Sequence, residues 1–155
     1  MEYVGQEPEP GCLFCRLRDQ DPALDRQTLV VAREPGALVV LNRFPYNSGH
    51  AMIAPERHAG DLVDLDEAET TQLMAALRST LRALRAAFSP DGFNVGVNLG
   101  RVAGAGIPDH VHIHVVPRWG GDTNFMPVLA EVKVVNEHLD RTWEKLEAAF
   151  SAAAS

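Results

Sequence analysis

Long apolar runs are absent from this sequence of 155 residues. A membrane-spanning helix needs about 20 consecutive apolar residues, and no segment of the chain offers such a run. The first 12 residues, MEYVGQEPEPGC, are acidic and rich in proline, whereas a secretory signal begins with basic residues and continues with an apolar run. We therefore expect no membrane segment and a cytoplasmic protein.

An excess of positive charge is also lacking. The chain has 14 Lys and Arg residues against 21 Asp and Glu residues, and its formal net charge is −7. Binding to nucleic acid or to an anionic membrane surface needs a basic face, so we expect neither partner. The balance is compatible with an anionic substrate that binds in a locally positive pocket.

Cysteine is scarce, and the chain has no internal repeats. The two cysteines, Cys12 and Cys15, form a C-x-x-C pair, which in a reducing compartment indicates a metal site or redox chemistry more than a structural disulfide. The composition, 46% hydrophobic and 23% charged, is that of an ordinary globular protein. We expect one domain over 11–150, with flexible segments at 1–10 and 151–155.

Short apolar runs alternate with turn residues along most of the chain. These runs predict strands over 29–33, 37–42, 51–54, 93–98 and 128–135. The first two strands would form a hairpin around Glu34-Pro35-Gly36. Strands that follow one another with one long helix between them predict an α+β domain built on an antiparallel sheet.

Two helices are predicted. Over 66–88, leucines recur at three- and four-residue steps, so an amphipathic helix would carry one apolar face. Asp64 or Asp66 can cap its start, and the acidic residues nearby therefore indicate capping and solvated surface rather than catalysis. A terminal helix is predicted over 137–150.

The segment DHVHIHVVPRW, residues 109–119, alternates histidine with Val and Ile. A strand directs successive side chains to opposite faces, so His110, His112 and His114 would form a row while the intervening apolar side chains enter a core. Pro117 would then end the strand because it has no N–H to donate. An ordinary half-exposed strand carries Thr, Lys, Glu or Ser at such positions, and a row of imidazoles therefore indicates a functional site.

This pattern, His-x-His-x-His followed by two apolar residues, resembles the histidine triad superfamily of nucleotide hydrolases and transferases. Further matching pieces are CLFC at 12–15, Gly49-His50 with Pro55 and His58, and the segment 94–98. The resemblance runs from Cys12 to Trp119 and beyond. It implies an α+β fold with an antiparallel sheet, one long helix and a C-terminal helix.

The resemblance implies a catalytic role for three histidines. His112 would be the nucleophile, with its other ring nitrogen held by a backbone carbonyl, and His114 would contact the phosphate and the leaving group. His50 would complete the site, its alternative being a surface residue in a turn. A neutral imidazole, with a pKa near 6.5, is a good nucleophile at physiological pH. Attack on the α-phosphorus of a nucleotide would give a nucleotidyl-histidine and divide one displacement into two easier steps.

The chain also resembles a zinc-bearing bacterial branch of the superfamily, and this resemblance implies a metal site. Its ligands would be Cys12, Cys15, His58 and His110. Four protein ligands leave no open position, so the zinc would be structural and His110 would not take part in catalysis. The alternative is a redox pair or two buried thiols. We expect no organic cofactor.

The nucleotide would occupy positions that the resemblance also assigns. These are Leu13, Phe14, Asn42, Asn98, Gly104, Ala105 and Gly106. Leu13 and Phe14, with Leu17, would pack on the base, although plain core packing explains them equally well. Asn42 would contact the ribose, and Asn98 with the Gly-rich loop would bind phosphate, because glycine lets backbone N–H groups approach an anion.

Two departures refine the expected reaction. Several branches carry a serine where this chain has Ile107, and that serine helps to protonate an amine leaving group. Ile107 cannot do so, which favours phosphoanhydride over phosphoramidate cleavage.

The segment 117–128 (PRWGGDTNFMPV) resembles the branch that acts as diadenosine tetraphosphate phosphorylase. There inorganic phosphate, rather than water, releases the nucleotide, and Trp119 would lie beside the entering phosphate. A simple turn is the alternative for this segment.

We therefore expect a nucleotidyltransferase that cleaves diadenosine tetraphosphate and acts as a homodimer or higher homo-oligomer. Three rival interpretations remain open. The first is a hydrolase or phosphoramidase of the same superfamily that releases AMP. The second is a nucleotide-binding module without turnover. The third is a hydrolase that uses the histidines as catalytic metal ligands, against which the lack of a matching carboxylate counts.

Overall fold

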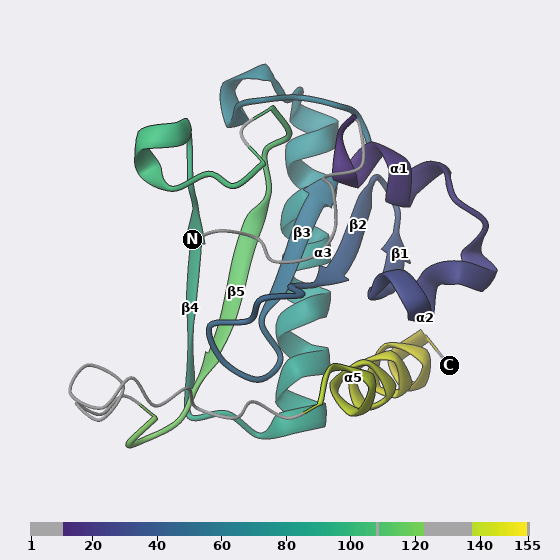
Figure 1. Cartoon of the computed structure of the whole chain (residues 1–155), viewed down its shortest axis with the longest axis vertical. Coiled ribbons are helices and arrows are strands. Elements are labelled where there is room, and N and C mark those ends of the chain that lie inside the picture. Colours follow the sequence, from purple (N-terminus) through teal and green to yellow (C-terminus); the bar gives the residue numbers. More distant parts are fainter. Residues whose placement is uncertain (1–10, 108, 123–137, 155) are drawn as a thin grey trace.

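The computed structural model describes residues 11–107, 109–122 and 138–154. Five antiparallel strands form one sheet in the order β1-β2-β3-β5-β4 (Figure 1). The strands are β1 (Val30–Glu34), β2 (Ala37–Leu41), β3 (Ala51–Pro55), β4 (Gly92–Val97) and β5 (Ile113–Arg118). The predicted α+β class and antiparallel sheet are thus confirmed.

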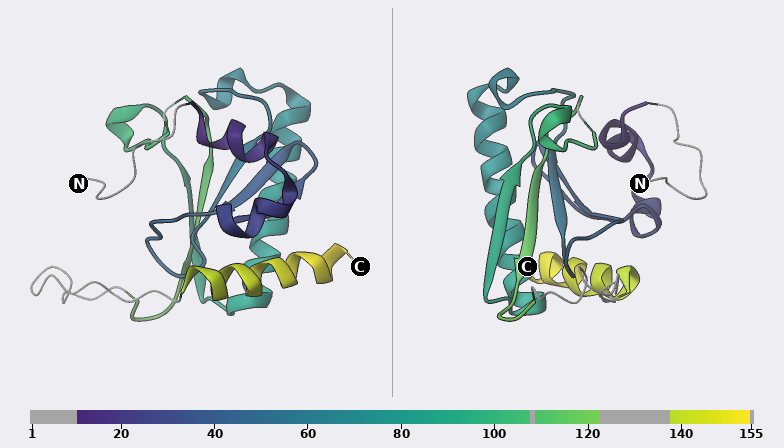
Figure 2. Two further views of the ribbon diagram at one scale, coloured as in Figure 1. Left: turned by 45° about the vertical axis from the view of Figure 1, so that its right-hand side comes forward. Right: turned by 60° about the vertical axis from the view of Figure 1, so that its left-hand side comes forward.

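Helices cover both faces of the sheet. The long helix α3 (Glu67–Phe88) lies on one face, and the short helices α1 (Leu13–Asp19) and α2 (Asp25–Thr28) lie on the other (Figure 2). The C-terminal helix α5 (Leu139–Ala154) contacts α3 and β1. Across the described residues, no helix is both long enough and apolar enough to cross a membrane.

Helix α3 begins with an acidic cap, as predicted from the acidic residues around position 66. Asp66 is the N-cap, and its carboxylate accepts a hydrogen bond from the Glu69 backbone N–H at 2.8 Å. Glu69 in return accepts from the Asp66 N–H at 2.9 Å, which completes a capping box. The same Glu69 side chain pairs with Arg57, and this holds its pKa down at about 2. These carboxylates therefore serve structure.

The β1–β2 hairpin turns at Pro35-Gly36, as predicted, with Glu34 opposite Ala37. Gly36 has φ +73°, a left-handed conformation that glycine adopts without strain. β2 and β3 are buried along their whole length because helices cover them on both faces. β4 lies at the edge of the sheet and is largely exposed.

The histidine segment differs from the predicted continuous strand. β5 begins only at Ile113, so His110 and His112 precede it. The backbone N–H of Val111 instead donates to Ala59 at 2.7 Å. Pro117 does not end the strand but lies within it, opposite Phe93 of β4. The strand is paired on one side only at this point, which is where a sheet tolerates proline.

The C-terminal helix also differs from its predicted bounds. α5 continues to Ala154, so four residues of the segment assigned to a flexible tail, 151–154, are helical. Three of those residues are alanine, the residue with the highest helix propensity. The strand predicted over 128–135 lies outside the described residues.

Candidate functional site

The rings of His50, His114 and His112 follow one another in a row, and His110 lies at the opposite end of β3 from His50, against the carbonyl of Pro55. His50 directly precedes β3, His110 and His112 precede β5, and His114 lies within β5. His50 and His110 are fully buried, and His112 is 4% exposed. The ring of His114 lies 4.8 Å from that of His112 and 5.2 Å from that of His50, measured between centroids. The structure therefore brings together the predicted catalytic residues.

The backbone determines which nitrogen of His112 carries the proton. Nδ1 of His112 lies 2.8 Å from the carbonyl oxygen of His110. A carbonyl can only accept, so Nδ1 must carry the proton, and Nε2 of the neutral ring is left with a lone pair. Burial lowers the pKa of His112 from its ordinary value. The ring is therefore neutral at pH 7, with Nε2 able to attack.

A second chain of hydrogen bonds determines the tautomers of His50 and His114. The backbone N–H of Tyr46 donates to Nδ1 of His50 at 3.1 Å, so Nδ1 must be an acceptor. Nε2 of His50 then carries the proton and donates it to Nδ1 of His114 at 3.0 Å. His114, with its Nδ1 occupied as an acceptor, keeps an N–H at Nε2.

Burial keeps the hydrogen-bonded rings of His50 and His114 neutral. Burial, and then the neighbouring rings of His114 and His112, lower the pKa of His50 to about 4, because a positive charge is unfavourable in this place. Burial and His112 also lower the pKa of His114. The site thus presents one imidazole lone pair on His112 beside one imidazole donor on His114.

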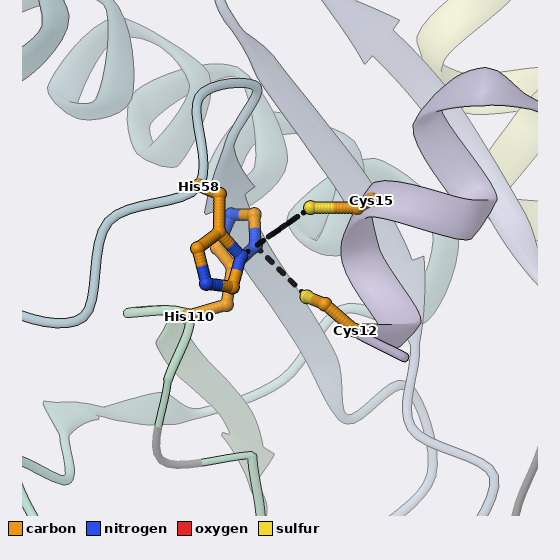
Figure 3. A group of neighbouring side chains, drawn as sticks. All are labelled: Cys12, Cys15, His58 and His110. Carbon is orange, nitrogen blue, oxygen red and sulfur yellow. Dashed lines mark hydrogen bonds between the residues drawn. The ribbon is translucent and has the colours of Figure 1, made fainter. Parts of the chain in front are cut away.

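The four predicted metal ligands also come together. Cys12 and Cys15 extend from the start of α1 toward the rings of His58 and His110 (Figure 3). Their sulfur and nitrogen ligand atoms all lie within 4.8 Å of one another. Sγ of Cys12 is 3.2 Å from Nδ1 of His110, and Sγ of Cys15 is 3.4 Å from Nδ1 of His58. Tetrahedral zinc with such ligands separates sulfur from nitrogen by about 3.5 Å, so the four residues fit a metal ion.

The hydrogen bond formed by the other ring nitrogen of His110, Nε2, supports the same conclusion. Its Nε2 donates to the carbonyl oxygen of Pro55 at 2.8 Å, which leaves the Nδ1 lone pair directed at the two thiols. Histidines that bind metals commonly donate their second ring nitrogen to a carbonyl in this way. The two cysteines are not joined as a disulfide.

The predicted base-binding residues lie mainly in the core. Phe14 is 1% exposed, and its ring contacts the rings of His110 and His112 at 5.2 and 5.0 Å between centroids. Leu17 is buried, and Leu13 is partly buried against the same core. Phe14 therefore packs α1 onto the histidine segment, in line with the core-packing alternative.

Asn42 lies beside His50, and Asn98 lies between the cavity at His114 and the Gly-rich loop. The Oδ1 atom of Asn42 accepts from the Phe44 N–H at 2.9 Å, and its amide nitrogen lies 3.5 Å from Nδ1 of His50. On the other side, the amide of Asn98 donates to the carbonyl of Gly104 at 3.5 Å. Gly104 has φ +88°. Ala105 and Gly106 follow Gly104 and lead toward the histidine segment.

A cavity of about 440 Å³ opens beside His114. Its lining includes the predicted Asn98 and residues that sequence reasoning did not assign to the site, namely Tyr46, Asn47, Asn94, Gly96 and Arg118. A glycine inside an alternating strand, as in FNVGVN, is the sequence signal that could have indicated a close approach by a ligand. Trp119 does not line this cavity; its backbone forms the predicted turn, with the Asp122 N–H donating to its carbonyl at 3.1 Å.

Comparison with known proteins identifies relatives over most of the chain. The model of the HIT domain family matches residues 23–121. A Mycobacterium tuberculosis protein named AP-4-A phosphorylase is 45% identical over 118 residues, which cover 76% of this chain and 60% of that protein. An uncharacterised HIT-like protein of Methanocaldococcus jannaschii is 30% identical over 137 residues, covering 88% of this chain and 98% of its own length. The chain thus spans 60% of the length of the first relative.

One solved structure bears on the metal cluster. A zinc-bound histidine triad family protein from Mycobacterium smegmatis superimposes with a TM-score of 0.72 at 25% identity, covering 92% of this chain and 95% of that chain. That protein has the same fold and is zinc-bound.

Proposed function

This chain belongs to the HIT domain family, and we propose that it is a nucleotidyltransferase that cleaves diadenosine tetraphosphate with inorganic phosphate. The observation that carries the proposal is the hydrogen bond from Nδ1 of His112 to the carbonyl of His110, at 2.8 Å, which leaves Nε2 as a nucleophile. The relative named AP-4-A phosphorylase, 45% identical over 76% of this chain, supports the choice of substrate.

The first step forms a bond between Nε2 of His112 and the α-phosphorus. The bond between that phosphorus and the bridging oxygen breaks, and ATP leaves. The positive charge that develops on the His112 ring is stabilised through its Nδ1–H by the His110 carbonyl. The Nε2–H of His114 donates to the phosphate oxygens as the leaving group departs. ATP leaves as an anion and needs no proton, which is consistent with Ile107 in place of a hydroxyl residue.

In the second step, an oxygen of inorganic phosphate attacks the same phosphorus. The N–P bond breaks, Nε2 regains its lone pair and ADP is released. A hydrolase would use water for this step and would release AMP. Asn42 would hold the ribose and Asn98 with residues 104–106 the phosphates, and Trp119 would lie beside the entering phosphate.

We further propose that Cys12, Cys15, His58 and His110 hold a structural zinc ion. Zinc bound there would cross-link α1 to the histidine segment. All four of its coordination positions would be occupied by protein, so it would not contact the nucleotide.

We also propose a homodimer. In the described part of the chain β4 is a sheet edge, and Val95 on it is 45% exposed. Exposed edges are usually covered by another segment or another chain. Light scattering coupled to gel filtration would give twice the 16.9 kDa of one chain; a mass of one chain would contradict the proposal.

Product identity tests the reaction. Diadenosine tetraphosphate is incubated with the protein, with and without inorganic phosphate, and the nucleotides are separated. Phosphate-dependent formation of ADP and ATP supports the proposal, whereas AMP and ATP formed without phosphate would make the protein a hydrolase. His112→Ala should abolish turnover, and His138→Ala, at an exposed histidine of α5's N-terminal end, should retain it.

A further inference from the structure

The cavity beside His114 is built from two neighbouring strands and one loop. On the sheet, Gly96 of β4 lies directly opposite His114 of β5, and both line the cavity. A Cβ atom added at Gly96 would have no heavy atom within 4 Å. The lack of a side chain at this position therefore leaves open space next to the histidine that faces the departing group.

An exposed aromatic ring forms one wall of this space. Tyr46 is 71% exposed, although large aromatic side chains are usually buried when they have no partner. Its ring lies 4.6 Å from the ring of His50 and 6.3 Å from that of His114, almost parallel to the latter at 22°. One face is therefore held against the histidines, and the rest of the ring can receive another flat group.

The remaining walls combine the apolar side chains of Val95 and Val116 with polar groups whose charges balance. Arg118 forms two hydrogen bonds of 2.7 Å to Asp122 and a third, of 2.6 Å, to Oδ1 of Asn94. Asn47 also donates to Asp122, at 3.0 Å. Because the guanidinium charge is matched by a carboxylate, the part of the cavity at Arg118 and Asp122, away from His114 and Asn98, does not suit a polyphosphate. The side-chain amides of Asn47 and Asn94 can form hydrogen bonds with hydroxyls. The exposed ring of Tyr46 and the backbone at Gly96 can accommodate a neutral, flat group.

We infer that this cavity binds the second nucleoside of a dinucleoside polyphosphate, the one that departs with the leaving nucleotide. The inference rests on the proposed function. The base would stack on Tyr46, and the ribose would lie against β4 at Gly96, with the amides of Asn47 and Asn94 within its reach. Its size agrees, since ligand cavities usually measure about 300–1,000 Å³ and this one measures about 440 Å³. The cavity thereby selects substrates with a nucleoside at both ends.

The matched substrates are diadenosine tetraphosphate and adenosine 5′-tetraphosphate, which differ only in the second nucleoside. The quantity measured is the ratio of their kcat/KM values. Tyr46→Ala removes the stacking surface, and Gly96→Leu fills the cavity, so each should lower the ratio about tenfold, the usual effect of losing one base stack. Tyr46→Phe keeps the ring and should preserve the ratio.

The chain offers a control for each variant. Phe44 lies on the same loop and is 61% exposed, but does not line the cavity, so Phe44→Ala should leave the ratio unchanged. Gly92 lies in the same strand with equally open space around it and also outside the cavity, so Gly92→Leu controls for Gly96→Leu. A ratio that does not change in Tyr46→Ala and Gly96→Leu overturns the inference.

A binding measurement separates this inference from the proposed reaction. In the His112→Ala background, calorimetry gives the affinities of both nucleotides without turnover. Tighter binding of diadenosine tetraphosphate, lost on adding Tyr46→Ala, supports the inference even if the wild-type protein cleaves neither compound, a result that would refute only the proposed reaction. Absence of a preference, whether both nucleotides bind equally or neither binds, overturns the inference.

Discussion

His110 supports His112 with its backbone and faces the cysteines with its side chain. Its carbonyl oxygen accepts the Nδ1–H of His112 at 2.8 Å, while its own Nδ1 lies 3.2 Å from Sγ of Cys12. One buried residue therefore belongs both to the proposed metal site and to the support of the proposed nucleophile. A change in the conformation of the Cys/His cluster should therefore change the orientation of the His112 ring.

Substitution at the exposed metal ligand tests the proposed zinc site. His58→Gln should abolish zinc binding without opening a cavity in the core, because His58 is exposed. Loss of the cross-link should lower the free energy of unfolding by about 3 kcal/mol and the Tm by about 10 °C. Zinc content is measured by atomic absorption and the Tm by circular dichroism.

The matched control is His138→Gln, at an exposed histidine outside the cluster. It should keep one zinc ion per chain and the wild-type Tm. A wild-type protein that contains no zinc after purification in zinc-containing medium would contradict the structural-zinc proposal and favour a redox role for the two thiols.

The buried His50 predicts a dependence of stability on pH. Its pKa is lowered from 6.5 to about 4, chiefly by burial and then by His114 and His112. Below pH 6.5 the unfolded chain binds a proton at this residue and the folded chain does not, so stability falls as pH decreases toward 4. The loss attributable to His50 is about 3 kcal/mol over this range.

Urea unfolding at pH 7 and at pH 4.5 measures this loss. His50→Gln should reduce the pH dependence by the share of one histidine, although His112 and His114, whose pKa values are also lowered, will keep part of it. His138→Gln should leave the slope as in the wild type. An unchanged slope in His50→Gln would show that folding does not lower the pKa of this residue.

The N-terminus of α3 offers a test of the capping box. Asp66→Ala removes the side-chain acceptor for the Glu69 N–H and should lower the free energy of unfolding by about 1 kcal/mol. Asp64→Ala, two residues earlier in the preceding 3-10 turn, should change it by less than about 0.5 kcal/mol. Equal effects of the two substitutions in urea unfolding would contradict the assignment of Asp66 as the cap.

The elements predicted from sequence are those whose pattern is local. The leucine repeat gives α3 to within one residue, and the Pro35-Gly36 turn gives the first hairpin. The row of histidines pointed to the site because imidazoles at alternate positions have few purely structural explanations. Each of these signals lies within a few consecutive residues.

The elements that escaped prediction depend on contacts between distant segments. Helix α1 is short, and the burial of Phe14 against His110 and His112 helps to hold it in place. β5 begins late because the backbone at Val111 bonds to Ala59 and not to a neighbouring strand. The cavity combines the loop at Tyr46 with β4 and β5. No pattern within one segment indicates that these three meet.

The link between that loop and the turn after β5 gives the last prediction. Asp122 accepts two hydrogen bonds from Arg118 and one from Asn47, and its side chain is only 13% exposed. Asp122→Asn replaces one acceptor oxygen with a donor, so at least one of these donors loses its partner. Because bonds to a carboxylate from charged and amide donors are strong, we expect a loss of about 1–3 kcal/mol in urea unfolding.

A double-mutant cycle with Arg118→Gln shows whether the loss belongs to this pair. If the bidentate contact is the cause, the double variant will be more stable than the sum of the single losses predicts, with a coupling of about 1 kcal/mol. Asp140→Asn, at an exposed carboxylate on α5, controls for the change in net charge. Strictly additive losses would mean that Asp122 acts through Asn47 and the turn backbone instead. The Tyr46 loop would then be held in place independently of Arg118.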